Sequence, residues 1–373
     1  MKGMTVVFRA DASLQIGSGH IMRCLTLADA LRAEGAECHF ICREHTGHLL
    51  DFISDKGFIA HKLQVQKDVR HDEEKKISES PMHSHWLGAT QEQDAIASRS
   101  ILEWLRPDWL IVDHYALNAC WEKKARQFCR KLMVIDDLAD RQHVCDLLLD
   151  QNLGRLPSDY ARHVPLGCEL LTGPAFALLR SEFSELRSYS LERRTSPNLK
   201  KLLITMGGVD ENNATGLVLN ALQVTLLPED VHITVVMGAA APWLADVQYL
   251  AKQIPYPTEV VFNVSDMARR MAVSDLAIGA AGSTSWERCC LGLPSLMVVL
   301  ADNQSGIGEA LHNSGAAILL GRPDDIDFCA NVKKTVEVLA GNKEMQARIS
   351  SAAADIADGT GCTAVVSRIK ERS

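Results

Sequence analysis

No apolar run in the 373-residue sequence reaches the roughly 18–20 residues needed to span a bilayer. We also expect no signal peptide at residues 1–11, because they have the pattern of a strand that carries Arg9 and Asp11. Basic charge is not in excess, since the net charge is −8. Nucleic acids and anionic membranes attract clusters of Lys and Arg. We therefore expect a cytoplasmic monomer with no nucleic-acid and no membrane partner.

The eleven cysteines show no C-x-x-C spacing, and several of them, such as Cys24, Cys38 and Cys145, lie among apolar neighbours. This arrangement is typical of reduced thiols in the core of a cytosolic protein. His83 and His85 lie in a polar segment, where a solvated loop is a simpler interpretation than a pair of metal ligands. We predict neither a metal nor a cofactor.

Short apolar runs alternate with amphipathic stretches, which is the pattern of βαβ units around parallel sheets. Strands are predicted at 5–9, 38–42, 109–113, 132–135 and 147–149, and again at 201–205, 232–237, 258–262, 276–278, 295–299 and 317–320. Helices are predicted at 20–33 and 91–105 and in a tail from about residue 324. The predicted fold class is α/β.

The chain is too long for one ordinary core. We predict two Rossmann-like doubly wound domains, residues 1–183 and 199–373, with a charged linker at 184–198. The carboxyl ends of their strands would face each other across a ligand-binding cleft. Residues 65–85 are polar and His-rich and would form a surface insertion.

A glycine loop, Gly17-Ser18-Gly19, separates the first predicted strand from a helix that begins near His20. Glycines allow backbone amides to approach a ligand, and a helix N-terminus favours negative charge. A dinucleotide fingerprint would need a third glycine where Met22 stands. The positive end of a helix disfavours a protonated imidazole, so His20 could accept a proton, although a capping or core role is the structural alternative.

Two further loops in the second half have the same strand–loop–helix order. The first contains Gly207, Gly208 and Asp210, and an ordinary turn would also explain it. The second runs from Gly279 to Glu287, with small and hydroxyl residues at a helix start that would bind an anion. Glu287, one turn further, could bind a ribose diol. A capping box between Ser283 or Thr284 and Glu287 is the structural alternative.

Polar residues follow other predicted strands and would lie at the same edges of the sheets. Residues 263–267 could contact a pyrimidine, whereas 113–115 and 302–304 could reach a ligand from either domain.

Motifs in both halves resemble, in order, the UDP-2,4-diacetamido-2,4,6-trideoxy-β-L-altropyranose hydrolases of pseudaminic acid biosynthesis. They are residues 9–13, 16–25, 112–115, 136–139, 150–152, 178–180, 207–210, 279–287 and 303–304. The resemblance covers nearly the whole chain. It departs at Ser181, where a proline is expected, and at the insertion. It implies a GT-B-like fold, close to the UDP-N-acetylglucosamine transferase of peptidoglycan synthesis, with water as the acceptor.

The resemblance and the loop positions together give the predicted site. The catalytic residues are His20 as base, with Tyr115 and Asn303 beside the sugar. The substrate-binding residues are Arg9, Asp11, Gly17, Gly19, Gln151, Asn152, Arg180 and Gln304. The UDP-binding residues are Gly207, Gly208, Asp210, Asn263, Val264, Met267, Gly282, Ser283, Thr284 and Glu287.

The predicted function is inverting, metal-independent hydrolysis of a UDP-sugar, in which His20 removes a proton from water. One alternative is a glycosyltransferase that acts on a lipid or glycan acceptor. A membrane-docking face, basic and apolar, would be expected for a lipid acceptor, and the first half shows none. The other alternative is a UDP-sugar sensor without catalysis, which would not need His20 in the glycine loop.

Overall fold

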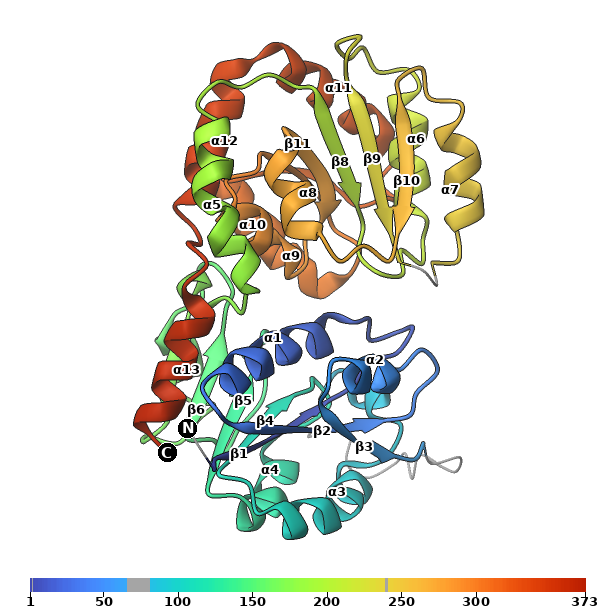
Figure 1. The fold of residues 1–373 in the computed structure, drawn as a ribbon. Helices are drawn as coiled ribbons and strands as arrows, with labels where there is room; N and C mark the ends of the chain where they lie inside the picture. The colour runs from blue at the N-terminus through green and yellow to red at the C-terminus, as the bar shows by residue number, and fades with distance from the viewer. Residues whose placement is uncertain (2, 66–80, 239–240) are drawn as a thin grey trace. The chain divides into compact units, whose positions relative to one another are not determined.

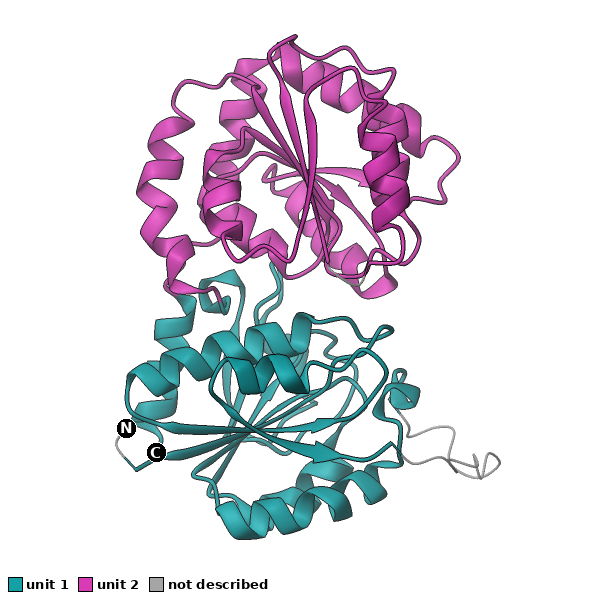
Figure 2. Cartoon of the chain, turned by 45° about the vertical axis from the view of Figure 1, so that its right-hand side comes forward, with its two compact units in different colours: residues 1–178, 361–373 teal, residues 179–360 magenta. Residues whose placement is uncertain are grey.

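The computed structural model describes residues 1, 3–65, 81–238 and 241–373. These residues form two compact units: unit 1 comprises residues 1–178 and 361–373, and unit 2 comprises residues 179–360 (Figure 2). Each unit contains one parallel sheet with helices on both faces (Figure 1). The predicted α/β class with two doubly wound domains is therefore confirmed.

The sheet of unit 1 has the strand order β3-β2-β1-β4-β5-β6-β7. Its strands are β1 (Thr5–Ala10), β2 (Glu37–Arg43), β3 (Ile59–Leu63), β4 (Trp109–Asp113), β5 (Lys131–Ile135), β6 (Leu147–Asp150) and β7 (Glu169–Thr172). The central strands are nearly continuous apolar runs, because a parallel sheet covered on both faces buries the side chains on both.

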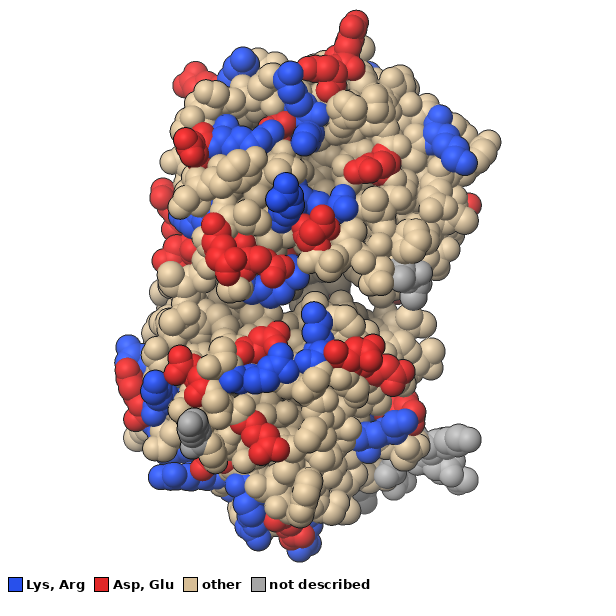
Figure 3. Space-filling view, viewed as in Figure 1, with Lys and Arg blue, Asp and Glu red and all other residues tan. Residues whose placement is uncertain are grey.

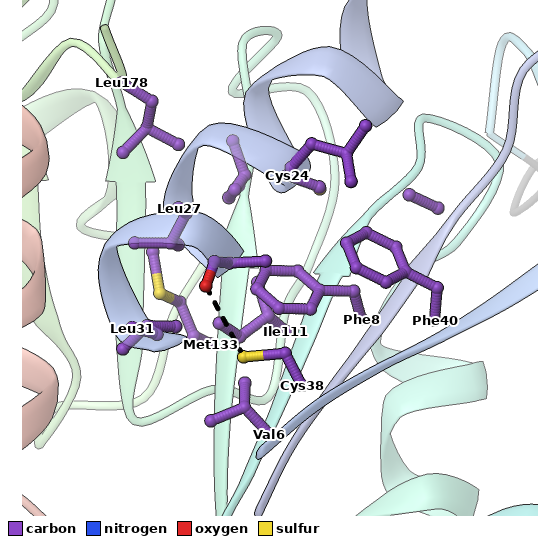
Figure 4. Packing of buried hydrophobic residues seen from close by; sticks show 14 of the residues in the cluster. Val6, Phe8, Cys24, Leu27, Leu31, Cys38, Phe40, Ile111, Met133 and Leu178 are labelled. Carbon is purple, nitrogen blue, oxygen red and sulfur yellow. Dashed lines mark hydrogen bonds between the residues drawn. The ribbon is translucent and has the colours of Figure 1, made fainter. Parts of the chain in front are cut away.

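Helices cover both faces of this sheet. They are α1 (Gly19–Ala33), α2 (Leu50–Asp55), α3 (Gln91–Leu105), α4 (Ala119–Ala125) and α13 (Gly361–Glu371), with short 3₁₀ turns at Ser84–Leu87, Arg126–Phe128, Pro157–Tyr160 and Pro174–Phe176. One core layer joins the sheet to α1, α2 and α13, and the other joins it to α3 and α4. Figure 4 shows the first layer, where the stacked rings of Phe8 and Phe40 pack near α1.

The sheet of unit 2 has the strand order β10-β9-β8-β11-β12-β13. Its strands are β8 (Lys201–Thr205), β9 (His232–Met237), β10 (Thr258–Phe262), β11 (Leu276–Ala280), β12 (Ser295–Val298) and β13 (Ile318–Gly321). In both sheets the order reverses beside the first strand, at β1/β4 and at β8/β11. Doubly wound folds bind their ligands at the carboxyl ends of the strands beside such a reversal.

The helices of unit 2 are α5 (Ser181–Arg193), α6 (Ala214–Leu222), α7 (Leu244–Ala251), α8 (Met267–Val273), α9 (Thr284–Cys290), α10 (Ser305–Asn313), α11 (Phe328–Gly341) and α12 (Lys343–Ala354), with a 3₁₀ turn at Asp302–Gln304. Apolar residues of α6, α7, α11 and α12 pack on one face of the sheet. Helix α5 packs beside α8 and α9.

The bounds of the units differ from the predicted domains in three places. The predicted linker 184–198 contains most of α5, whose buried Ser190 donates to the Leu291 carbonyl of unit 2 at 2.7 Å. Arg180, expected in the first domain, belongs to unit 2. The end of the predicted second domain, residues 361–373, belongs to unit 1, since α13 buries its apolar face there.

Most of the predicted insertion, residues 66–80, lies outside the described residues. Among the residues that are described, no helix has both the length and the apolar character that crossing a membrane requires. On the face seen in Figure 3, basic and acidic side chains are interspersed over both units.

Candidate functional site

The carboxyl edge of the unit 1 sheet brings His20 and Asp113 together at the strand-order reversal. His20 lies in the first turn of α1, which follows β1, and Asp113 is the last residue of β4. Because β1 and β4 are adjacent and parallel, the loops that leave them diverge at the same edge. Gly17, with a positive φ of 78°, closes the tight loop before α1 by donating its N–H to Ser13 O.

His20 and Asp113 form a short hydrogen bond. Nδ1 of His20 lies 2.6 Å from Oδ1 of Asp113, and both side chains are buried. An ionised carboxylate can only accept, so Nδ1 carries a proton, and in the neutral form of the ring the lone pair lies on Nε2. The sequence prediction for His20 considered only the helix N-terminus, which disfavours the protonated ring. The structure adds the buried carboxylate of Asp113, which favours it.

Arg23, one turn after His20, compensates that carboxylate. Its Nε and Nη2 donate to the two oxygens of Asp113, each at 2.7 Å, and its Nη1 donates to Asp137 Oδ2 at 2.7 Å. Burial alone would raise the pKa of Asp113, but the charges of Arg23 and His20 outweigh burial and hold this pKa well below its usual value. Asp113 is therefore ionised at neutral pH.

Tyr115 lies beside this group, with its ring edge-on to His20 at a centroid distance of 4.6 Å. Its hydroxyl donates to Asp137 Oδ2 at 2.6 Å. Burial, and after it the charge of Asp137, raises the pKa of Tyr115 well above its usual value. The ring of Trp86 stacks on Tyr115, so Tyr115 is a buried donor at neutral pH.

Arg9 and Asp11 are completely buried in a network of protein contacts. Arg9 donates to Asp11 at 2.7 Å and to both oxygens of Asp94. Asp11 also accepts from the backbone N–H of Arg43, and its other oxygen lies 3.1 Å from His114 Nε2. These contacts support a role in holding the β1 end in place, and contact of Arg9 or Asp11 with substrate remains a prediction.

The other predicted residues of unit 1 differ in accessibility. Gly19 is exposed at the start of α1. Gln151 is buried and its side chain accepts the N–H of Leu178 at 3.1 Å, whereas Asn152 donates to the Asp137 carbonyl at 3.2 Å. The loop after β6 therefore supports the loop that carries Asp137.

In unit 2, the loop after β8 carries Gly207, Gly208 and Asp210. Both glycines are exposed, and Gly207 has a positive φ of 89°. The buried carboxylate of Asp210 accepts the N–H groups of Ala214 and Thr215 at the start of α6, at 2.8 and 3.0 Å. Asp210 thus orders the loop, and the two glycines, which have no side chains, leave its backbone groups accessible to a ligand.

The loop after β11 begins α9, which has seven residues, and shows no capping box in the described structure. Ser283 is exposed and makes no side-chain capping bond. Glu287 lies 3.8 Å from Arg180 Nη2, and burial raises the pKa of Glu287 to about 7. The hydroxyl and carboxylate groups of this loop therefore keep acceptor capacity for a ligand. Arg180 and Glu287, predicted to bind different parts of the substrate, are neighbours.

Arg288 underlies this loop as a buried cation. Its guanidinium donates to Thr284 Oγ1 at 3.2 Å, to Ser285 Oγ at 3.0 Å and to the Ala280 carbonyl at 2.7 Å. A Cβ at Gly279 would lie 2.7 Å from Nη1, so glycine leaves room for the guanidinium. Burial lowers the pKa of Arg288 to about 10, although the neighbouring Glu287 acts in the opposite direction.

The remaining predicted residues follow other strands of unit 2. Asn263, with a positive φ of 51°, is exposed after β10, and Val264 and Met267 lead into α8. Asn303 is exposed on the 3₁₀ turn after β12, whereas the Gln304 side chain accepts the N–H of Leu300 at 3.0 Å. All follow the carboxyl ends of parallel strands, so they share one edge of the sheet.

Sequence reasoning did not single out Arg23, Asp137 or Arg288 as site residues. Arg23 is three residues after His20, which places both on one face of a helix, and this spacing was the available signal. The partners of Asp137 and Arg288 come from packing that the sequence pattern does not show.

No protein-family model matches the chain. A Campylobacter jejuni protein named UDP-2,4-diacetamido-2,4,6-trideoxy-beta-L-altropyranose hydrolase is 26% identical to it over 314 residues, which cover 84% of this chain and 97% of that protein. An uncharacterised protein of Methanocaldococcus jannaschii is 24% identical over 308 residues. That match covers 81% of this chain and 56% of that relative, so the chain spans little more than half of its length. The predicted resemblance is confirmed.

Among solved structures, MurG of Acinetobacter baumannii is similar over 99% of both chains, with a TM-score of 0.70 and 16% identity. This likeness, together with the two strand orders, confirms the GT-B-like fold.

Proposed function

We propose that the protein is an inverting hydrolase of a UDP-sugar, UDP-2,4-diacetamido-2,4,6-trideoxy-β-L-altropyranose, and that it releases UDP and the free sugar. The observation that carries this proposal is the pairing of His20 with Asp113 at the strand-order reversal of unit 1. The pairing gives Nε2 of His20 the lone pair of a general base. The name of the Campylobacter relative supports the choice of substrate.

In the proposed reaction, the oxygen of water forms a bond to the anomeric carbon while the bond from that carbon to the UDP oxygen breaks. His20 Nε2 takes the proton of the water, and UDP leaves with the electron pair of the broken bond. The positive charge that develops on the sugar ring makes the transition state oxocarbenium-like. General-base assistance of this kind contributes roughly 10²–10⁴-fold to the rate.

Unit 2 would hold the nucleotide. The loop 282–284 would bind the diphosphate, Glu287 the ribose diol, and the segment 263–267 the uracil edge. The buried charge of Arg288 supports this assignment, because it lies under Thr284 and Ser285 and also acts on Glu287. Stabilising the leaving diphosphate by fixed donors lowers the barrier without reorganisation. Asn303 and Tyr115 would contact the sugar.

Replacing His20 tests the role of the base. His20→Asn should lower kcat by at least about 100-fold, which is the lower range for general-base catalysis, and should leave UDP affinity within a few-fold. His312→Asn, a histidine change on α10, serves as the control and should keep full activity. Near-normal kcat in His20→Asn would show that His20 is not the base, and Tyr115 would then be the first residue to test for that role.

The second candidate function is glycosyl transfer to a lipid or glycan acceptor, and the GT-B-like fold favours it. The two functions differ in one requirement. A hydrolase releases UDP from the UDP-sugar without any acceptor, whereas a transferase needs the acceptor.

A further inference from the structure

One guanidinium connects the two candidate catalytic groups of unit 1. Through Asp113 the guanidinium of Arg23 reaches His20, and through Asp137 it reaches the hydroxyl of Tyr115. The five contacts in this chain measure 2.6 to 2.7 Å, and they join α1, the end of β4 and the loop after β5. The rigid fork of arginine matches both carboxylates at once.

The same contacts determine the charge around His20. Asp113 is completely buried, and an unpaired carboxylate next to His20 would stabilise the protonated imidazole. Arg23 occupies both oxygens of Asp113 and balances its charge. The carboxylate then orients His20 through Nδ1 without stabilising the imidazolium form, in which Nε2 also carries a proton.

We propose that Arg23 is a positioning residue of the reaction: it balances Asp113 so that His20 stays available as the base, and it holds Asp137 so that Tyr115 keeps its orientation. This inference rests on the proposed hydrolysis. A lysine would replace Arg23 only in part, because its single nitrogen cannot donate to both oxygens of Asp113 and also to Asp137.

The surroundings of His20 contain other groups that titrate or carry charge. On α1 the thiol of Cys24 lies 3.4 Å from Asp113 Oδ2. His83 and His114 interact electrostatically with His20, and Arg141 lies over the Tyr115 ring at 5.9 Å. Burial lowers the pKa of both His83 and His114, so both are neutral over most of the range in which enzymes are assayed.

Arg23→Gln and Arg23→Lys test the proposal. Arg32→Gln is the matched control, because Arg32 lies on the same helix and forms an ion pair at its surface with Asp29. We expect kcat to fall by about 100-fold in Arg23→Gln, in line with the loss of general-base assistance. In Arg23→Lys we expect a smaller fall, and in both variants UDP affinity should stay within about two-fold because UDP is assigned to unit 2. Arg32→Gln should match the wild type.

The pH profile separates positioning from a general structural role. Without Arg23, Asp113 stabilises the imidazolium, so the acidic limb of the kcat profile should move to higher pH in Arg23→Gln. In the double variant His20→Asn, Arg23→Gln, the second change should cost little more, because Arg23 acts through a base that is already missing. A uniform loss at all pH values, or losses that multiply in the double variant, would overturn the proposal.

NMR titration of the His20 imidazole gives a readout that does not require turnover. The resonance, assigned by its loss in His20→Asn, should titrate at higher pH in Arg23→Gln than in the wild type. An unchanged titration would refute the role of Arg23. Absence of UDP-sugar hydrolysis by the wild type, with the titration shifted as expected, would instead refute the proposed function.

Discussion

Glu287 is a half-buried carboxyl group, with 17% of its side chain exposed, and its charge changes near neutral pH because desolvation raises its pKa to about 7. The ionised form can accept one ribose hydroxyl on each oxygen with a charge-assisted hydrogen bond, whereas the protonated form presents one of its oxygens as an O–H donor. The raised pKa means that the group is protonated at pH 6 and ionised at pH 8. UDP should therefore bind more tightly at pH 8 than at pH 6, by up to about ten-fold per pH unit below the pKa, as measured by calorimetric titration.

Glu287→Gln is the control for that measurement, because UDP phosphates also titrate in this range. The variant keeps the shape of the side chain but cannot ionise, so only the pH dependence that belongs to UDP should remain. If wild type and Glu287→Gln show the same pH dependence, Glu287 does not bind the ribose as a carboxylate.

The sequence could indicate His20 as a candidate catalytic residue because His20 follows a glycine loop, which is a local feature. It could not indicate that Asp113 contacts His20 or that Asp137 contacts Tyr115, since these pairs are 93 and 22 positions apart in the chain. For Arg9 the resemblance implied substrate binding, whereas the structure buries the side chain against Asp94, which is 85 positions away.

Among the elements, the strands that carry long apolar runs were predictable to within one or two residues. Strands β4, β8, β9 and β10 have the predicted bounds. The sequence did not reveal β3 and β7, because both are short strands at the edges of the sheet with polar residues such as Lys62 and Glu169. Edge strands lack a second neighbour and need no continuous apolar run.

The loop after β8 depends on the start of α6. Asp210 accepts two N–H groups of that helix, so Asp210→Ala should lower the free energy of unfolding by about 1–2 kcal/mol, the usual cost of losing a cap. The loop of Gly207 and Gly208 should also lose order, which should weaken UDP binding. Denaturant unfolding and calorimetry measure the two effects.

Asp246→Ala is the control, because Asp246 is an exposed acidic residue in the first turn of α7, a helix of the same unit. It should change stability by less than about 0.5 kcal/mol, as is usual for surface positions. Equal effects of the two substitutions would contradict the role of Asp210 in ordering the loop.

For the whole molecule, two doubly wound units were predictable from the alternation of strands and helices, whereas their bounds were not. Helix α13 buries Cys362, Val365, Val366 and Ile369 in unit 1, although it follows unit 2 in the sequence. An apolar helix face indicates burial but does not show which sheet it covers. The bounds therefore depend on tertiary packing.

Hydrolysis should continue after treatment with EDTA. The reason is that the buried charge of Arg288 and the hydroxyl groups of Thr284 and Ser285 are available to stabilise the diphosphate. The rate of UDP release should be the same before EDTA treatment and after the treated protein has been desalted to remove the chelator. A loss of activity that Mg²⁺ or Mn²⁺ restores would show that a metal takes part.

The most direct test of the central claim is to incubate the protein with the UDP-sugar in ¹⁸O-labelled water, without an acceptor, and to analyse both products. We expect free UDP without label and free 2,4-diacetamido-2,4,6-trideoxy-L-altrose with ¹⁸O at the anomeric carbon. NMR of the first product formed should show the inverted anomer. Label in UDP would place the cleavage at phosphorus, and no release of UDP until an acceptor is added would show that the protein is a transferase.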